Sequence, residues 1–180
     1  MNQRNKILKE VLIITIVSLI TGLIVNSVNP KGIPLVRDDG DRFKIDSALT
    51  QGSENKPVEK VKTKEGFVKP VNIPVETAKK FFDENAVFID GREETEFKEG
   101  HIKGAINIPY KEFYAKTPED RQKMMDGIDK NKTIVSYCGS SECEISIDNA
   151  YEMAKIGYDN VKIFLGGYRE WNELGYPVNK

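Results

Sequence analysis

The sequence contains two cysteines, Cys138 and Cys143, and both follow a short apolar run that ends at Tyr137. The stretch TIVSYCGSSECEIS is typical of a buried strand that leads through a loop into a helix. Ligands of open parallel sheets bind at the carboxyl ends of strands, where the next helix presents unpaired N–H groups and its positive dipole end. A thiol there is stabilised as the nucleophilic thiolate. We therefore predict Cys138 to be a nucleophile rather than a small buried apolar residue.

A nucleophilic cysteine in a strand-to-helix loop serves either phosphate-ester hydrolysis or sulfur transfer. The first reaction requires an arginine clamp for the phosphoryl group, but Glu144 occupies that position and would repel a phosphate dianion. This excludes a phosphatase or an arsenate reductase. Sulfur transfer needs a thiolate and backbone N–H donors that hold the resulting persulfide anion. The donors would come from a loop of Gly139, Ser140, Ser141, Glu142, Cys143 and Glu144.

Cys143 admits two interpretations. It is either a packing residue at the start of the helix or a resolving thiol that converts a persulfide or sulfenic acid on Cys138 into a disulfide. Glu142 and Glu144 would raise the pKa of a nearby thiolate unless both carboxylates point outward into screening solvent. A zinc site would need a fourth ligand besides His101 and the two cysteines, and none is indicated. We expect no metal and no cofactor.

Apolar runs and helical patterns alternate along the chain after Pro70. Strand and helix in alternation predict crossover units and therefore an α/β fold, with a parallel sheet covered by helices on both faces. We expect buried strands over residues 86–90, 133–137 and 161–165, and helices over residues 74–82, 111–125, 146–156 and 168–174.

Residues 11–25 are uncharged and almost wholly apolar, and with residues 26–28 they are long enough to cross a bilayer as one helix. Arg4, Lys6 and Lys9 precede the run, which favours an N-terminus in the cytoplasm and a domain outside the cytoplasm. The alternative is a signal peptide cleaved after Ser27, although the A-x-A pattern is absent.

The rest of the chain divides by composition. Residues 29–69 are polar and rich in proline and charge, so we expect an extended linker between a membrane segment at 1–28 and a folded domain at 70–180. The chain carries 27 basic and 28 acidic side chains, for a net charge of −1. Without a basic tract, nucleic-acid binding is not expected.

The stretch FIDGREETEFKEGHIKGAINIP, residues 88–109, resembles the first signature of rhodanese domains. Cys138 lies where that family has its catalytic cysteine. The family's later glycines, its tryptophan and its final G-Y-P-V are matched by Gly157-Tyr158, Gly166-Gly167, Trp171 and Gly175-Tyr176-Pro177-Val178. The resemblance covers residues 70–180 and implies a small α/β unit around a parallel sheet of about five strands.

The resemblance implies a sulfurtransferase in which Cys138 carries sulfane sulfur as a persulfide and passes it to a thiophilic acceptor. Asp90 and Arg92 match the family's D-x-R, most simply as structural support, and His101 matches G-H-I as a hydrogen-bonding brace or a base. The loop is longer than in many members and lacks their cation, which favours a small neutral donor or a protein persulfide carrier over thiosulfate.

The leading prediction is therefore a membrane-anchored sulfurtransferase whose partners are a sulfur donor and the lipid bilayer. Two alternatives remain open at this point. One is a thiol–disulfide redox module that uses Cys138 and Cys143, and the other is a rhodanese-like domain that binds a partner without catalysis.

Overall fold

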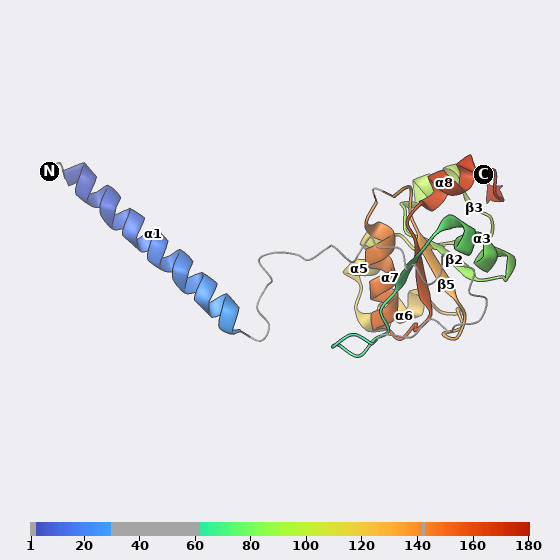
Figure 1. Ribbon diagram of the computed structural model, residues 1–180, viewed down its shortest axis with the longest axis horizontal. Coiled ribbons are helices and arrows are strands. Elements are labelled where there is room, and N and C mark those ends of the chain that lie inside the picture. Colours follow the sequence, from blue (N-terminus) through green and yellow to red (C-terminus); the bar gives the residue numbers. More distant parts are fainter. Residues whose placement is uncertain (1–2, 30–61, 142) are drawn as a thin grey trace. The chain divides into compact units, whose positions relative to one another are not determined.

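The computed structural model describes residues 3–29, 62–141 and 143–180 (Figure 1). The chain divides into two units, Met1–Asp39 and Gly40–Lys180. Residues 30–61, which make up most of the predicted linker, lie outside the described residues. The first unit contributes one helix, and the second contains the α/β domain.

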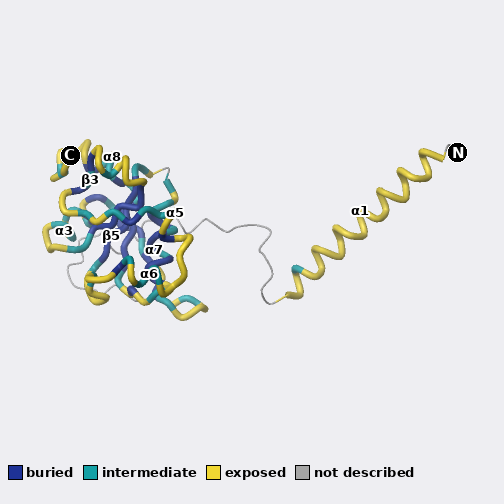
Figure 2. Tube along the Cα trace, turned by 180° about the vertical axis from the view of Figure 1, so that it is seen from behind, coloured by how far each residue is buried: buried dark blue, intermediate teal, exposed yellow. Residues whose placement is uncertain are grey.

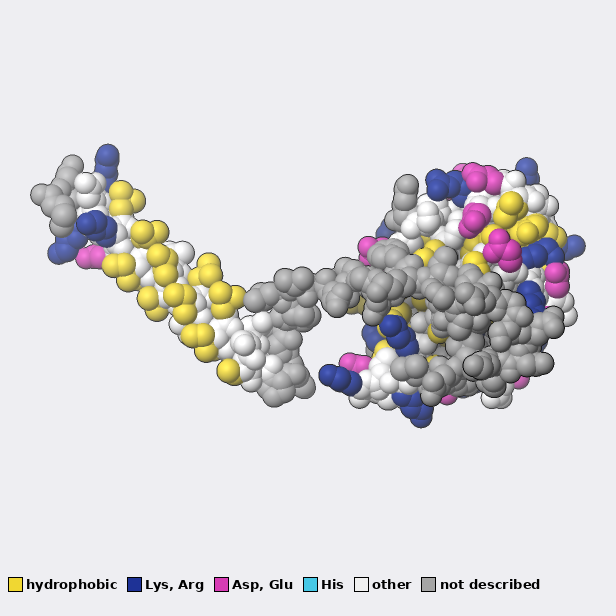
Figure 3. Space-filling model, in the orientation of Figure 1, with side chains coloured by type: hydrophobic (Ala, Val, Ile, Leu, Met, Phe, Trp, Pro, Cys, Tyr) yellow, Lys and Arg dark blue, Asp and Glu magenta, His cyan; other side chains and the backbone are white. Residues whose placement is uncertain are grey.

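Helix α1 spans Gln3–Val28, and none of its side chains is buried. Its first two turns carry charged residues, whereas residues 11–25 are almost wholly apolar on all sides. Figure 3 shows hydrophobic side chains along the helix and basic ones near its N-terminal end. The hydroxyls of Thr15 and Thr21 donate to the carbonyl oxygens of Val11 and Val17, at 2.9 and 2.8 Å. Within the described ranges, α1 is the one helix whose length and composition suit a membrane span.

The α/β domain is built on a five-stranded parallel sheet with the strand order β1-β6-β5-β2-β4. The two outer strands are short because they hold only a few apolar residues. The α/β fold and the parallel sheet of five strands predicted from the sequence are confirmed. The strands span Val71–Ile73 (β1), Val87–Asp90 (β2), Ile106–Asn107 (β4), Ile134–Tyr137 (β5) and Val161–Phe164 (β6).

Helices cover both faces of the sheet, as predicted, and each face has its own core (Figure 2). Successive strand residues point to opposite faces, so that Phe88 packs in one core and Ile89 in the other. Trp171 is fully buried against Phe82 and Phe88, with ring centroids 5.2 and 5.6 Å away. The helices are Val75–Asp83 (α3), Glu94–Glu99 (α4), Tyr110–Ala115 (α5), Pro118–Met124 (α6), Ile145–Lys155 (α7) and Gly167–Glu173 (α8).

The single helix predicted over residues 111–125 is wrong, because the structure has two helices, α5 and α6, in that region. Thr117 caps the second helix by accepting a hydrogen bond from the Asp120 N–H at 3.2 Å, and Pro118 follows at its first position. Proline biases the residue before it away from helical geometry, so the chain breaks at Thr117.

Two smaller features complete the domain. Strands β3, His101–Ile102, and β7, Val178–Asn179, form a separate antiparallel pair. Residues 62–69, which the sequence assigned to the linker, contain a bridge between Lys62 and Val68, and Val68 is buried. The C-terminal part of the expected linker therefore packs with the domain.

Candidate active site at the end of strand β5

Cys138 directly follows β5, and the backbone around it is tied to the first turn of α8. The Tyr168 N–H donates to the Cys138 carbonyl oxygen at 2.8 Å, and the Arg169 N–H donates to that of Gly139 at 3.0 Å. Gly167 has φ +65°, and a Cβ there would collide with the Cys138 carbonyl. The glycine therefore permits the close approach that holds the start of the loop.

The thiol of Cys138 is fully buried, and carbonyl groups surround it more closely than the prediction assumed. Its sulfur lies 3.2 Å from the Cys143 carbonyl oxygen and 3.5 Å from that of Ser140, which are alternative acceptors for the one S–H proton. A hydrogen bond to the Cys143 sulfur, together with burial, raises the pKa of the Cys138 thiol above its ordinary value. Within the hydrogen-bonded pair, Cys138 is therefore the thiol that keeps its proton at neutral pH.

The Ser146 hydroxyl lies beside the Cys138 sulfur and is a contact that sequence reasoning missed. Its oxygen is buried and has no oxygen or nitrogen partner among the described residues, while its hydrogen bond with the Cys138 sulfur lowers that thiol's pKa. Ser136 donates to the Ser146 carbonyl oxygen at 2.9 Å, which ties the start of α7 to β5. From sequence alone, a serine near the start of a helix is expected to cap that helix. Its contact with the Cys138 sulfur is visible only in the structure.

Cys143 is half-buried, and its sulfur receives the backbone donors that were expected to face Cys138. Hydrogen bonds from the Cys138 thiol and from the N–H groups of Ile145 and Gly139 lower the pKa of Cys143 from 9.0 to about 6, although partial burial opposes the shift. Ile145 is the first residue of α7, so Cys143 lies at the positive end of that helix. The accessible thiolate of the pair is therefore on Cys143.

This assignment predicts how alkylation of the full chain depends on pH. Cys143 is thiolate above its pKa and protonated below it, so its reaction with iodoacetamide should fall as the pH drops through about 6. Mass spectrometry of the alkylated peptide gives the midpoint. In Cys138→Ala the midpoint should rise, because the S–H donor that contributes most to the shift is lost. A wild-type midpoint at the ordinary thiol value of about 8.5 would contradict the assignment.

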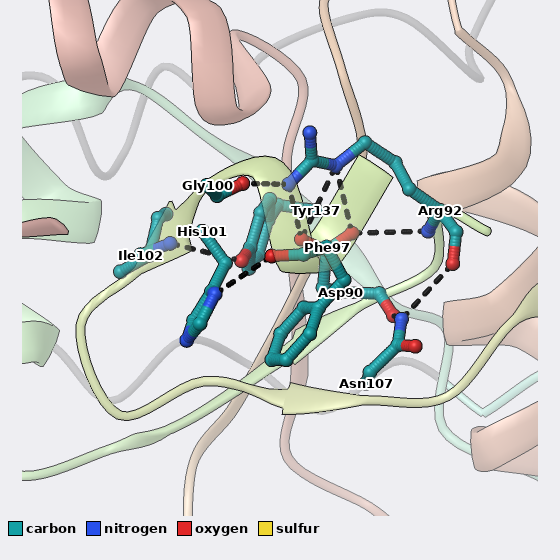
Figure 4. A network of polar contacts seen from close by, with 8 residues as sticks. All are labelled: Asp90, Arg92, Phe97, Gly100, His101, Ile102, Asn107 and Tyr137. Carbon is teal, nitrogen blue, oxygen red and sulfur yellow. Dashed lines mark hydrogen bonds and ion pairs between the residues drawn. The ribbon is translucent and has the colours of Figure 1, made fainter. Parts of the chain in front are cut away.

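Asp90 and Arg92 form a buried ion pair beside the loop (Figure 4). The Arg92 Nη2 group donates to Asp90 at 2.7 Å and to the Gly100 carbonyl oxygen at 2.7 Å, while Nε and the backbone N–H also donate to Asp90. The guanidinium lies 4.7 Å from the centre of the Tyr168 ring. A Cβ at Gly139 would lie 3.7 Å from Arg92 Cδ. Arg92 therefore contacts α8 through the Tyr168 ring and lies close to the start of the loop.

Tyr137, the last residue of β5, joins the hydrogen bonds around Asp90 to strand β3. Its hydroxyl accepts a hydrogen bond from the Ile102 N–H at 3.2 Å and shares another with Asp90. Burial, and then the Asp90 charge, raise the pKa of Tyr137 well above its usual range. The tyrosine therefore stays neutral and donates to the carboxylate. Sequence reasoning missed this residue because it placed Tyr137 only as the end of a strand.

His101 is held within its own turn. Its Nδ1 hydrogen-bonds with the Phe97 carbonyl oxygen at 2.8 Å, and its ring stacks on the Phe97 ring at a centroid distance of 3.8 Å. Both contacts fix the His101 ring against Phe97, as expected of a structural residue (Figure 4). The described parts of the chain hold no group of three His, Cys, Asp or Glu side chains that converge to bind a metal ion.

Two exposed glutamates lie near the loop. Glu144 is exposed at the start of α7, and the exposed Glu96 of α4 opposes ionisation of Cys143. Ser140 accepts a hydrogen bond from the Cys143 N–H at 3.1 Å, whereas Ser141 is exposed. Glu142 lies outside the described residues. Within the described loop, residues 138–141 and 143–144, there is no Lys or Arg to attract an anionic donor.

Comparison with known proteins gives concordant matches over this domain. Residues 74–174 match the Rhodanese-like domain family. Thiosulfate sulfurtransferase 18 of Arabidopsis thaliana is 27% identical over 116 residues, which cover 61% of this chain and 83% of the relative. The mitochondrial protein HIGH ARSENIC CONTENT 1 of the same plant is 30% identical over 140 residues, covering 73% of this chain and 74% of the relative.

A solved structure supports the fold independently. A crystallised protein from Bacillus halodurans matches with a TM-score of 0.51 at 25% sequence identity, and the match covers 60% of this chain and 75% of that one.

Proposed function

Because the chain belongs to the rhodanese-like domain family, we propose that it is a sulfurtransferase that carries sulfane sulfur as a persulfide on Cys138. The family predicted from the sequence is thereby confirmed, and the domain is homologous to thiosulfate sulfurtransferases. One observation carries the proposal: two hydrogen-bonded thiols lie at the carboxyl end of β5, beneath backbone N–H donors. Such donors stabilise a persulfide anion as well as a thiolate.

Cys138 becomes reactive through its neighbour. The two thiols lose their first proton as a pair, and the charge lies mainly on Cys143, whose pKa is about 6. The Cys138 S–H donates to that thiolate. As a sulfane donor approaches, Cys138 transfers its proton to Cys143 and attacks the donor sulfur. Cys143 and its part of the loop must move outward, because Cys138 itself is fully buried.

The donor that suits this site is a neutral small molecule or a protein persulfide. The carboxylate of Glu96 raises the pKa of Cys143, and exposed Glu144 adds a second negative charge near the loop. The nearby guanidinium of Arg92 already binds Asp90 and the Gly100 carbonyl oxygen. A dianion such as thiosulfate would therefore meet net repulsion at this site, screened only in part by salt.

Helix α1 supplies the proposed membrane anchor. Its exposed apolar surface has no partner within the described unit, and the Thr15 and Thr21 hydroxyls are hydrogen-bonded inside the helix, which reduces their cost in hydrocarbon. Basic residues near its N-terminus favour a cytoplasmic N-terminus and an extracytoplasmic domain. As part of this proposal, the chain divides into a membrane segment at 1–28, a linker that begins at residue 29 and a domain at 70–180, with which residues 62–69 at the end of the expected linker pack.

A second candidate function follows from the contact between the two thiols. Cys138 and Cys143 share a hydrogen bond, so they are placed to exchange between dithiol and disulfide. In this case the domain would oxidise or reduce a partner without carrying sulfur. The mass of the modified peptides separates the two functions, since a disulfide loses two hydrogens and a persulfide gains one sulfur atom.

Mass spectrometry of the full chain in detergent tests the proposal. After brief exposure to inorganic polysulfide and rapid alkylation, the peptide with Cys138 should gain one sulfur atom. The Cys143→Ala variant is measured alongside, because only Cys138 can then react. Added sulfur found only on Cys143, or on neither cysteine in either protein, would reject the proposal.

A further inference from the structure

The sulfur of Cys143 is hydrogen-bonded to the Cys138 thiol and receives the N–H donors of Gly139 and Ile145 that the outer sulfur of a persulfide on Cys138 would need. We propose that Cys143 resolves that persulfide, releasing sulfide and leaving a Cys138–Cys143 disulfide that an external dithiol reduces. The inference rests on the proposed function, because it starts from a persulfide on Cys138. Beyond that function, it names sulfide as a product, Cys143 as the resolving thiol and an external dithiol as the partner.

The geometry of the loop brings the two cysteines together. The Cys143 N–H donates to the Ser140 carbonyl oxygen at 3.1 Å, which closes a turn over Cys138. The Cys138 sulfur lies 3.2 Å from the Cys143 carbonyl oxygen. The Cys138 thiol is also hydrogen-bonded to the Cys143 sulfur. Cysteines are bridged without backbone strain only when their side chains already point toward each other. Both cysteines are reduced, and their side chains already share a hydrogen bond.

The same donors would serve both the persulfide and Cys143. The N–H groups of Gly139 and Ile145 donate to the Cys143 sulfur, which is in contact with the Cys138 thiol. The outer sulfur of a persulfide lies one S–S bond, about 2.05 Å, from the inner sulfur and needs the same N–H donors. Loading Cys138 therefore displaces the Cys143 side chain, and return of Cys143 to its site favours loss of the outer sulfur.

The different exposure of the two cysteines indicates that Cys143, and not an external thiol, attacks the persulfide first. Cys138 is fully buried, whereas Cys143 is only half-buried on an outer part of the loop. An external thiol has no direct path to the inner sulfur of a persulfide on Cys138, but the Cys143 thiolate reaches it from within the loop. Intramolecular attack also has the advantage of proximity.

The proposed reaction needs only the persulfide on Cys138, the Cys143 thiolate and an external dithiol. The Cys143 thiolate attacks Sγ of the Cys138 persulfide, the bond between that Sγ and the outer sulfur breaks, and the electron pair leaves as HS⁻. A Cys138–Cys143 bond forms, so that one sulfane sulfur is reduced while two thiols are oxidised. One thiol of an external dithiol then attacks the more exposed Cys143 sulfur. Its second thiol completes the exchange, and the dithiol leaves as a disulfide.

A single-turnover experiment on the full chain in detergent tests this step. The protein is loaded with inorganic polysulfide, freed of excess donor and incubated without added thiol, while sulfide is trapped with monobromobimane. The wild type should release one sulfide per disulfide formed, and dithiothreitol should restore both thiols. Cys143→Ser and Cys143→Ala should keep the persulfide on Cys138 and release sulfide at least about 10-fold more slowly.

The alternative outcomes separate the inference from the proposed function. A wild-type persulfide as long-lived as that of Cys143→Ser, with no disulfide, would overturn the inference and leave the sulfurtransferase intact. A disulfide formed without matching sulfide would also overturn it and would favour the thiol–disulfide module. Failure of every variant to gain sulfur would reject the proposed function itself. Using both Ser and Ala at position 143 excludes a folding defect peculiar to one replacement.

Discussion

Replacing Cys138 with serine should abolish sulfur transfer to cyanide and leave the α/β fold intact. Serine is close in size to cysteine, and its hydroxyl can donate to the carbonyl oxygens of Ser140 and Cys143 that now accept from the thiol. A hydroxyl does not form a persulfide under these conditions. Removing the nucleophile of a covalent mechanism lowers turnover by roughly 10⁴-fold or more, so thiocyanate formation should fall to background.

The matched control for this variant is Cys143→Ser, the same atomic change in the same loop. It should form a persulfide on Cys138 more slowly than the wild type, because the proton acceptor Cys143 is lost. Once loaded, it should still pass the sulfur to cyanide, because cyanide attacks the outer sulfur. Thermal unfolding of both variants should resemble that of the wild type. If Cys138→Ser kept more than a tenth of wild-type activity while Cys143→Ser lost it, the roles of the two cysteines would have to be exchanged.

The sequence contained enough information for the central part of the fold. The three inner strands, β2, β5 and β6, were predicted because a strand buried on both faces is a continuous apolar run. The outer strands β1 and β4 have three and two residues, too few to show a period. The break between α5 and α6 had a signal, Thr117 before Pro118, which the helical pattern around it outweighed.

The site was less predictable, for a physical reason. The apolar pattern predicts that Cys138 follows a buried strand, whereas the supporting role of Asp90 and Arg92 was expected from the resemblance to rhodanese domains. Which sulfur faces the N–H groups depends on the loop conformation, set by the turn from Ser140 to Cys143. Sequence spacing does not encode that turn, so the depressed pKa was expected on Cys138 although the structure assigns it to Cys143.

The buried ion pair should dominate the stability of the sheet end. Asp90→Ala should lower the free energy of unfolding by about 3–5 kcal/mol, because it leaves the Arg92 guanidinium buried without its counter-charge. The Asp90 side chain is 0% exposed and that of Arg92 is 8% exposed, so water cannot replace the lost partner. Denaturant unfolding of the full chain in detergent, followed by fluorescence of the single Trp171, measures the change.

Two controls assign the loss to an uncompensated charge. Glu94→Ala breaks the exposed Glu94–Lys98 pair, whose side chains are 69% and 70% exposed, and should leave stability unchanged within error. The double variant Asp90→Leu/Arg92→Met replaces both charges with apolar groups and should recover much of the loss. If Asp90→Ala left the free energy of unfolding unchanged, as Glu94→Ala should, the Asp90–Arg92 pair would contribute little to stability.

The same variant should also slow sulfur loading, because the pair braces the loop that holds the thiols. Arg92 binds the Gly100 carbonyl oxygen and lies over the Tyr168 ring, while the Tyr168 N–H donates to the Cys138 carbonyl oxygen. Freed from Asp90, the guanidinium would lose its fixed position, and with it the contact with Tyr168 that helps to hold the start of the loop. Under native conditions, persulfide formation in Asp90→Ala should therefore slow, whereas Glu94→Ala should load at the wild-type rate. Unchanged loading in a destabilised Asp90→Ala would mean that the pair holds the sheet end but not the loop.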